Sequence, residues 1–237
     1  TGNGDIGNQG VHEMDLARWA IKDATLPSKV WSLGGRFGYE DQGETPNTQM
    51  AVCEFGDTLL VFEVRGLVEG ESKSERKVCN EYYTTEGMIS DGRFHPKGGG
   101  TPERLDVEAT VASGGPFGSF INAVRSRDQE DLNAEAIEGH FSSALCHLAN
   151  ASYRLGEEVP FNSKTKALGD NKEVHQTFEN LKENLGEGVG LNLEDMSYRL
   201  GKTLTVDVEK EQFIDNPEAN ALITREYRKP FVVPEKV

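Results

Sequence analysis

The chain has 237 residues, of which 36% are hydrophobic and 27% charged, a composition typical of a globular protein with a modest core. Its formal net charge of −15 argues against nucleic acid or an anionic membrane as the main partner, because both attract basic patches. No apolar run approaches the roughly 20 residues of a membrane-spanning helix, so we expect a soluble protein of one large domain or two small ones.

The N-terminal part of the chain predicts a short helix followed by a run of strands. Apolar residues recur at helical spacing over 11–21, and residues 25–28 break the pattern. Strand-like segments follow at 29–39, 47–55 and 58–66. Gly56 and Asp57 form a short polar link typical of a hairpin, which indicates antiparallel pairing.

The rest of the chain predicts more strands and then helices. Strands are expected at 76–85 and 87–94, with a further edge strand at 105–112 after a Gly- and Pro-rich loop. Helices are expected at 117–127, 134–155 and 171–185, and extended segments that lie against the main body at 204–208 and 227–233. Asn133 and Gly156 are the expected caps of the second of these helices.

This order of elements predicts an α+β fold, a two-layer α/β sandwich with an open, mostly antiparallel sheet and helices packed on one face. A doubly wound nucleotide-binding domain would alternate strand and helix, and this chain does not. We expect residues 1–165 to form the core of the domain and residues 166–237 to be a C-terminal extension packed on it.

Gly2, Gly4 and Gly7 have the G-x-G-x-x-G spacing of a dinucleotide-binding loop, and Asp23 follows at about the distance of a ribose-binding acid. In that motif a strand delivers the glycine turn, and a helix N-terminus then meets the pyrophosphate. Only Thr1 precedes the first glycine, and no parallel βαβ unit follows. The context therefore argues against a cofactor loop.

Metal and cysteine chemistry are not indicated either. His12-Glu13 begins a zincin motif, but Leu16 occupies the place of the second histidine. His140 and His147 are seven residues apart with no third ligand at a suitable spacing, so we expect hydrogen-bonded core histidines and no metal. The three cysteines are far apart and form no C-x-x-C, which indicates ordinary buried thiols; they are Cys53, Cys79 and Cys146.

His12 is the most informative titratable residue, because Asn8 lies four residues before it and Asp15 three after it. If the helix reaches back to Asn8, the amide and the imidazole project to the same side. Such a pair could bind a hydroxyl and move its proton near neutral pH. The alternative is that these polar residues only cap free N–H groups at a helix N-terminus, and spacing alone favours it.

A family resemblance changes that balance. Residues 4–19 read G-x-x-x-N-x-G-V-H-x-x-D-L-A-R-W, which resembles the start of the C-terminal domain of the Gfo/Idh/MocA oxidoreductases. The segments HFSSALCHLANASYRLG at 140–156 and NALITREYRKPFVVP at 220–234 resemble bacterial members of that family, in particular those common in planctomycetes. Together these pieces cover most of the chain.

The resemblance implies a two-domain enzyme, in which an N-terminal Rossmann domain binds NAD or NADP and supplies a catalytic lysine in an E-K-P motif. Neither a valid fingerprint nor E-K-P occurs here, so we expect a fragment without that domain, inactive alone. His12 matches the family's catalytic acid/base, and Asn8 stands where an aspartate is usual. Because an amide takes no proton, Asn8 would position the substrate, with Asp5 as a neighbouring carboxylate.

The expected function is therefore the substrate-binding and oligomerisation domain of an NAD(P)-dependent oxidoreductase that acts on a sugar, polyol or related hydroxyl compound. One alternative is an NAD-dependent glycoside-cleaving or epimerising member of the same family. Another is a non-catalytic assembly domain. The expected partners are a small-molecule substrate and further copies of the chain through the open sheet. A cytoplasmic location is expected, with export left open.

Overall fold

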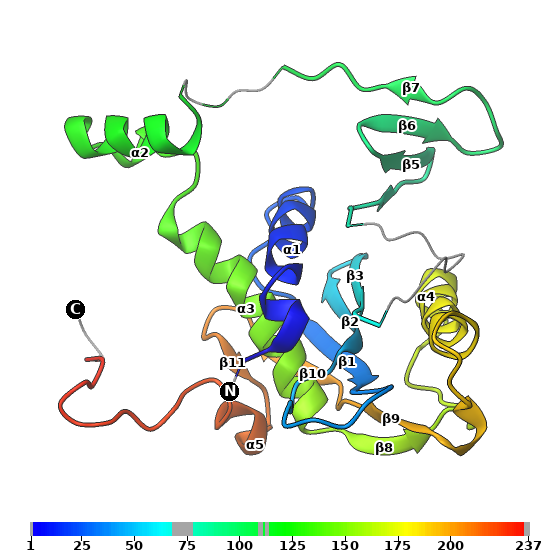
Figure 1. Ribbon diagram of the computed structural model, residues 1–237. Helices are drawn as coiled ribbons and strands as arrows, with labels where there is room; N and C mark the ends of the chain where they lie inside the picture. Colours follow the sequence, from blue (N-terminus) through cyan, green and yellow to red (C-terminus); the bar gives the residue numbers. More distant parts are fainter. Residues whose placement is uncertain (1, 68–77, 109–110, 112–113, 235–237) are drawn as a thin grey trace.

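The computed structural model describes residues 2–67, 78–108, 111 and 114–234, and is built around one antiparallel sheet (Figure 1). The strands run in the order β11-β10-β1-β2-β3, and β9 joins β1 with β8 outside it. Their bounds are β1 (Lys29–Gly35), β2 (Thr48–Phe55), β3 (Thr58–Arg65), β8 (Glu157–Pro160), β9 (Ser197–Leu200), β10 (Leu204–Asp207) and β11 (Gln212–Phe213). The expected α+β class with an open antiparallel sheet is confirmed.

Strands β2 and β3 form the predicted hairpin. They stay in register from Thr48 opposite Arg65 to Phe55 opposite Thr58. Gly56 turns the chain with a φ of +59°, a left-handed conformation that a residue without a Cβ adopts at little cost. The two-residue link therefore sets the pairing of both strands.

Strand β1 shares one of its edges between two strands from the end of the sequence. Its start pairs with β10, where Val30 lies opposite Leu204. Its end pairs with β9, where Leu33 lies opposite Leu200. The C-terminal part of the chain thus completes the sheet itself.

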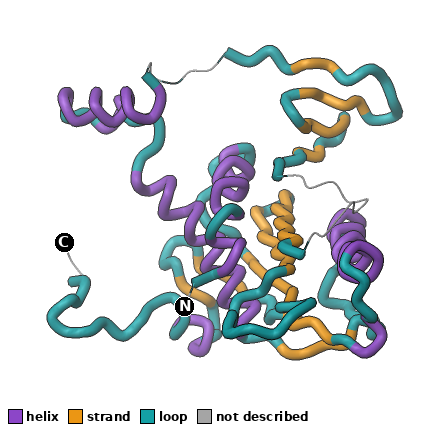
Figure 2. The backbone as a smooth tube through the Cα atoms, viewed as in Figure 1, coloured by secondary structure: helices purple, strands orange, loops and turns teal. Residues whose placement is uncertain are grey.

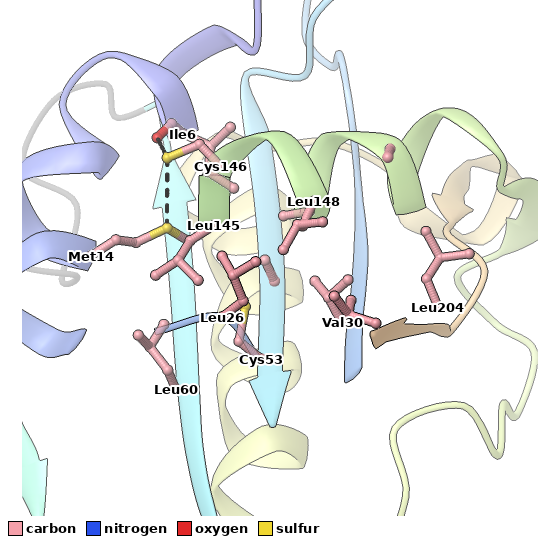
Figure 3. Packing of buried hydrophobic residues seen from close by; sticks show 14 of the residues in the cluster. Ile6, Met14, Leu26, Val30, Cys53, Leu60, Leu145, Cys146, Leu148 and Leu204 are labelled. Carbon is pink, nitrogen blue, oxygen red and sulfur yellow. Dashed lines mark hydrogen bonds between the residues drawn. The ribbon is translucent and has the colours of Figure 1, made fainter. Parts of the chain in front are cut away.

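Two helices, α1 (Gly10–Trp19) and α3 (Ala136–Arg154), pack on one face of the sheet. Figure 3 shows Leu145 and Cys146 of α3 lying over Val30 and Cys53 of the sheet, beside Met14 of α1. The Cys146 thiol donates to the Ile6 carbonyl at 3.0 Å. Leu145, Cys146 and Leu148 thus lie on the buried face of α3, the helix that the sequence predicts over 134–155.

Helix α4 (Lys172–Glu183) covers the opposite face, which corrects the expectation that helices lie on one face only. The first half of its apolar stripe, Val174 and Phe178, packs with Trp31 and Met50 of the sheet. The ring of Tyr198 completes this cluster, 5.2 Å from that of Phe178 between centroids. Successive residues of a strand point to opposite faces, so β1 and β2, apolar on both faces, need cover on both.

The remaining elements lie outside this sheet (Figure 2). They are a small antiparallel sheet of β4 (Tyr82–Tyr83), β5 (Gly87–Ser90), β6 (Arg93–Pro96) and β7 (Glu103–Arg104), the helices α2 (Gly115–Ser126) and α5 (Pro217–Asn220), the 3-10 turns η1 (Gly4–Gly7), η2 (Gln129–Asp131) and η4 (Leu193–Asp195), and the π turn η3 (Asn184–Gly188). None of the helices in the described ranges has the length and apolar run needed to cross a membrane.

Several predicted boundaries were wrong. The strand predicted over 87–94 is the hairpin β5–β6, which turns at Asp91 and Gly92 with positive φ values. Of the strand predicted over 76–85, residues 76–77 lie outside the described residues. In the remaining part only β4 forms. Residues 105–108 and 111 are not strand, and the remainder of the edge predicted over 105–112 lies outside the described residues.

The C-terminal half differs in its caps and its end. Glu135, not Asn133, is the N-cap of α3. Gly156 serves close packing instead of a left-handed cap, because a Cβ there would lie 2.4 Å from the Leu200 carbonyl oxygen. The segment 227–233 does not pack on the body, and Phe231 is 70% exposed.

We expect Leu145→Ala to lower the free energy of unfolding by about 2–5 kcal/mol, because it removes a fully buried side chain and leaves a cavity. The matched control is Leu16→Ala on α1, where the side chain is 52% exposed and the change should stay within about 0.5 kcal/mol. Urea unfolding followed by circular dichroism measures both. Equal losses for the two variants would contradict the position of the core.

Candidate functional site

Most glycines at the start of the chain pack against other residues, and the described residues form no phosphate cradle there. Gly2 precedes η1, Gly4 and Gly7 lie in η1, and Gly10 begins α1; no strand of the described chain precedes them. A Cβ on Gly4 would lie 2.9 Å from the Thr45 side chain, and one on Gly10 would lie 2.6 Å from the Phe62 ring. The described residues therefore do not fit a dinucleotide-binding loop, and close packing accounts for Gly4 within the three-glycine spacing.

His12 is exposed in the first turn of α1. Its backbone N–H donates to the Gln9 carbonyl at 3.0 Å, which fixes the start of the helix. Within the described residues the structure shows no hydrogen bond or ion pair to the imidazole. Both ring nitrogens are therefore open to a ligand from solvent, with one able to accept a proton and the other to donate a hydrogen bond.

Asn8 lies next to this turn but outside the helix. It ends η1 with a φ of −102° and a ψ of −90°, and α1 begins only at Gly10. The helical argument for pairing Asn8 with His12 is therefore wrong, since helical spacing does not extend back to residue 8. The helix instead joins Gln9 to Glu13, with Nε2 of Gln9 at 3.1 and 3.2 Å from the two carboxylate oxygens.

Asn8 nevertheless stays near the candidate site through the backbone. Its N–H donates to the Asp5 carbonyl at 3.2 Å, and its own side chain is exposed. The Asp5 side chain is half-buried, and its carboxylate lies 3.2 Å from the position a Cβ on Gly66 would take. Asp5 thus points toward the end of β3, whereas Asn8 and His12 face solvent.

Asp15 belongs to the packing of the helices and not to the His12 turn. It accepts a hydrogen bond from Ser142 of α3. Ser142 also accepts from Arg18, whose side chain is only 4% exposed and forms an ion pair with Glu138. A second Arg18 nitrogen donates to the Ala24 carbonyl at 2.8 Å. This network binds α1 to α3 and satisfies the buried guanidinium.

Sequence reasoning did not single out Arg18, although it stands in the motif at residues 4–19. The available signal was its position. Arg18 lies four residues after Met14, so helical spacing places it on the buried face of α1, where an arginine needs partners.

A groove of about 600 Å³ lies beside Arg18, between the end of α1 and the beginning of α3. Its wall combines exposed apolar side chains with carboxylates. The lining residues are Arg18, Trp19, Ile21, Asp23, Ala24, Thr25, Leu132, Asn133, Ala134, Glu135, Ile137, Glu138 and Phe141. His12, Asn8 and Asp5 are not among them, so the groove and the His12 turn are separate features.

His140 and His147, the other two histidines considered as metal ligands, have structural partners. His140 pairs with Glu211 at 2.8 Å, and His147 Nδ1 lies 2.9 Å from the Asn3 amide nitrogen. Both are hydrogen-bonded as expected, but they are exposed on α3 instead of buried in the core. No group of three or more metal-ligating side chains occurs among the residues that the structure describes.

Comparison of the chain with protein-family models, with curated proteins and with solved structures found no match. Any assignment of function therefore depends on the residues and their geometry.

Thiol chemistry provides a direct check of the packing around α3. Burial raises the pKa of the Cys146 thiol to about 12, and burial together with the neighbouring Cys146 raises that of Cys53 to about 12. The thiolate is the reactive form, so both should be nearly inert to Ellman's reagent at neutral pH. Cys79 is only partly buried and should react first.

Urea should bring all three thiols into reaction, and Cys79→Ser should remove the fast phase in the native protein. Rapid native reaction of Cys53 or Cys146 would contradict the burial described here.

Proposed function

We propose that this chain is the substrate-binding domain of an NAD(P)-dependent oxidoreductase that acts on a sugar, polyol or related hydroxyl compound. The observation that carries the proposal is the exposed His12 imidazole in the first turn of α1, with the exposed Asn8 amide just before the helix. This turn belongs to the segment that resembles the Gfo/Idh/MocA oxidoreductases, and the α+β fold agrees with the domain which that resemblance implies.

His12 is the proposed acid/base of the site. A neutral imidazole accepts the proton of a substrate hydroxyl as the carbinol is oxidised and returns it in the reverse direction. Asn8 offers an amide donor and an acceptor that hold a neighbouring hydroxyl, and it takes no part in proton transfer. Asp5 is the third proposed substrate contact, reached from the β3 side of the turn.

The hydride chemistry belongs to NAD or NADP, which this proposal places on a separate dinucleotide-binding domain. The described residues of the chain form no cradle for the pyrophosphate. The contribution of this chain is to bind and orient the hydroxyl compound and to hold its proton at His12.

Two alternative functions make different predictions from the proposed one. A glycoside-cleaving or epimerising enzyme would use the same His12 turn and differ only in its products. A non-catalytic assembly domain is favoured by a different observation, the exposed apolar residues of α2. Contact between copies through an open sheet face has little support, because α1 and α3 cover one face and α4 the other.

The absence of disulfides among the described cysteines agrees with a reducing compartment, and we propose that the protein is located in the cytoplasm. None of the three described cysteines forms a disulfide, and Cys53 and Cys146 lie in the core. Disulfides are rare where thioredoxin and glutathione keep thiols reduced.

Nuclear magnetic resonance of the labelled chain, titrated with a panel of polyols and sugars that begins with myo-inositol and glucose, tests the site. We expect saturable shifts at the His12 ring and the Asn8 amide. Replacing the histidine, His12→Phe, should weaken binding about fivefold or more, since one hydrogen bond contributes about 1 kcal/mol. The chain alone should not reduce NAD(P).

The matched control is His140→Phe, which removes an exposed histidine from α3 and should leave polyol binding unchanged. Shifts confined to other regions, equal effects of the two substitutions, or NAD(P) reduction by the chain alone would contradict the proposal.

A further inference from the structure

Helix α2 carries an apolar stripe that nothing in the described structure covers. Phe117 is 81% exposed and Phe120 63%, and Ile121 and Val124 are also exposed. These residues recur at i, i+3, i+4 and i+7, which is the spacing of one helix face. Figure 1 shows α2 extending away from the main sheet.

The chain itself holds α2 by the opposite face. Ser119, the buried residue of the helix, donates to the Asp131 carbonyl at 3.1 Å and accepts from the Asn133 N–H at 2.8 Å. At about 100° per residue, the centre of the apolar stripe lies about 150° around the helix from Ser119. The attachment that fixes α2 to its own chain therefore turns the stripe outward.

The local sequence gives α2 little stability of its own. The helix has 12 residues, no side-chain bond at its N-cap, and Arg127 in a left-handed conformation at its C-cap. Isolated helices of this length are marginal in water, and most helical stability comes from packing an apolar face. A partner on the stripe would supply that packing.

The charge of α2 indicates what kind of partner fits. Residues 114–127 contain Arg125 and Arg127 and no acidic residue, although the whole chain has a net charge of −15. The structure shows no ion pair for either arginine among the described residues. The partner surface should therefore combine exposed apolar side chains with carboxylates.

The groove at the end of α1 has that combination. Trp19 is 52% exposed and Ile137 46%, and the carboxylates of Asp23 and Glu135 line the same groove. Neither carboxylate has an ion-pair partner in the described part of the chain, whereas the third one, on Glu138, is bound to Arg18. Aromatic side chains and arginines are the residues most enriched at protein interfaces.

We infer that α2 of one copy docks into the groove of a second copy of this chain, and that the exchange is reciprocal. The Phe117–Val124 stripe lies against Trp19 and Ile137, and Arg125 and Arg127 meet Asp23 and Glu135. Because each copy carries both the helix and the groove, the contact is made twice around a two-fold axis, as in most homodimers. The inference is independent of the proposed reaction at His12.

A pair of charge-reversed proteins tests this contact. The first carries Arg125→Glu and Arg127→Glu, so that acidic helices face acidic grooves. The second carries Asp23→Arg and Glu135→Arg, so that basic helices face basic grooves. Each alone should dimerise about tenfold or more weakly than the original chain, because like charges oppose each other across the contact. Mixed in equal amounts, they should form a heterodimer, since both contacts again join opposite charges.

Sedimentation velocity over a range of micromolar concentrations measures the dimer. Lys164→Glu with Lys166→Glu is the matched control, because it makes the same charge change at exposed residues near α4 and should leave the dimer intact. A further variant, Phe117→Ser with Phe120→Ser, removes the apolar half of the contact and should abolish dimerisation. Circular dichroism confirms that each variant is folded.

Three results would overturn the inference: a monomer at every concentration, a dimer that the arginine reversals leave unchanged, or a mixture that does not recover the heterodimer. If a small molecule bound in the groove and the sedimenting mass of the protein did not change, the groove would belong to that ligand and not to α2.

Discussion

The structure depends on strand β1 being buried on both faces. Six of its seven residues are buried, with Val30 toward α3 and Trp31 toward α4. Burying a side chain of this size contributes about 1.5–3 kcal/mol, so neither face can be left to water. The two helical layers, and the division of the core into a cluster on each side of the sheet, follow from that one requirement.

Polar contacts then fix how the helices lie on this strand. The Ser32 N–H donates to the Ser152 hydroxyl of α3 at 3.0 Å, and that hydroxyl donates to the Lys202 carbonyl at 2.7 Å. Arg18 and Ser142 join α1 to the same helix. With α1 held in this way, its first turn presents His12 to solvent. The candidate site is therefore a helical turn whose imidazole has no partner among the described residues, and its position depends on packing several residues away.

Much of the fold could be predicted from the sequence, and less of the site. Periodicity and the Gly56-Asp57 link identified the strands of the β2–β3 hairpin and the helix over 136–154, because those signals are local. The second helical layer was missed, since it depends on which face of a distant strand is still exposed. The helical argument that placed Asn8 beside His12 failed for a related reason: the start of α1 is set by where η1 ends, which spacing does not reveal.

The shared edge of β1 has a consequence for how the protein is made. Residues 29–35 are synthesised well before the strands that complete their pairing, β9 and β10, which come from residues 197–207. Contacts of such long sequence separation form slowly, because a large loop must close first. During translation the apolar surface of β1 therefore stays unpaired along that edge until β9 and β10 have been synthesised. We therefore expect a nascent chain of this protein to expose β1 as an unpaired apolar strand, the kind of surface that chaperones shield.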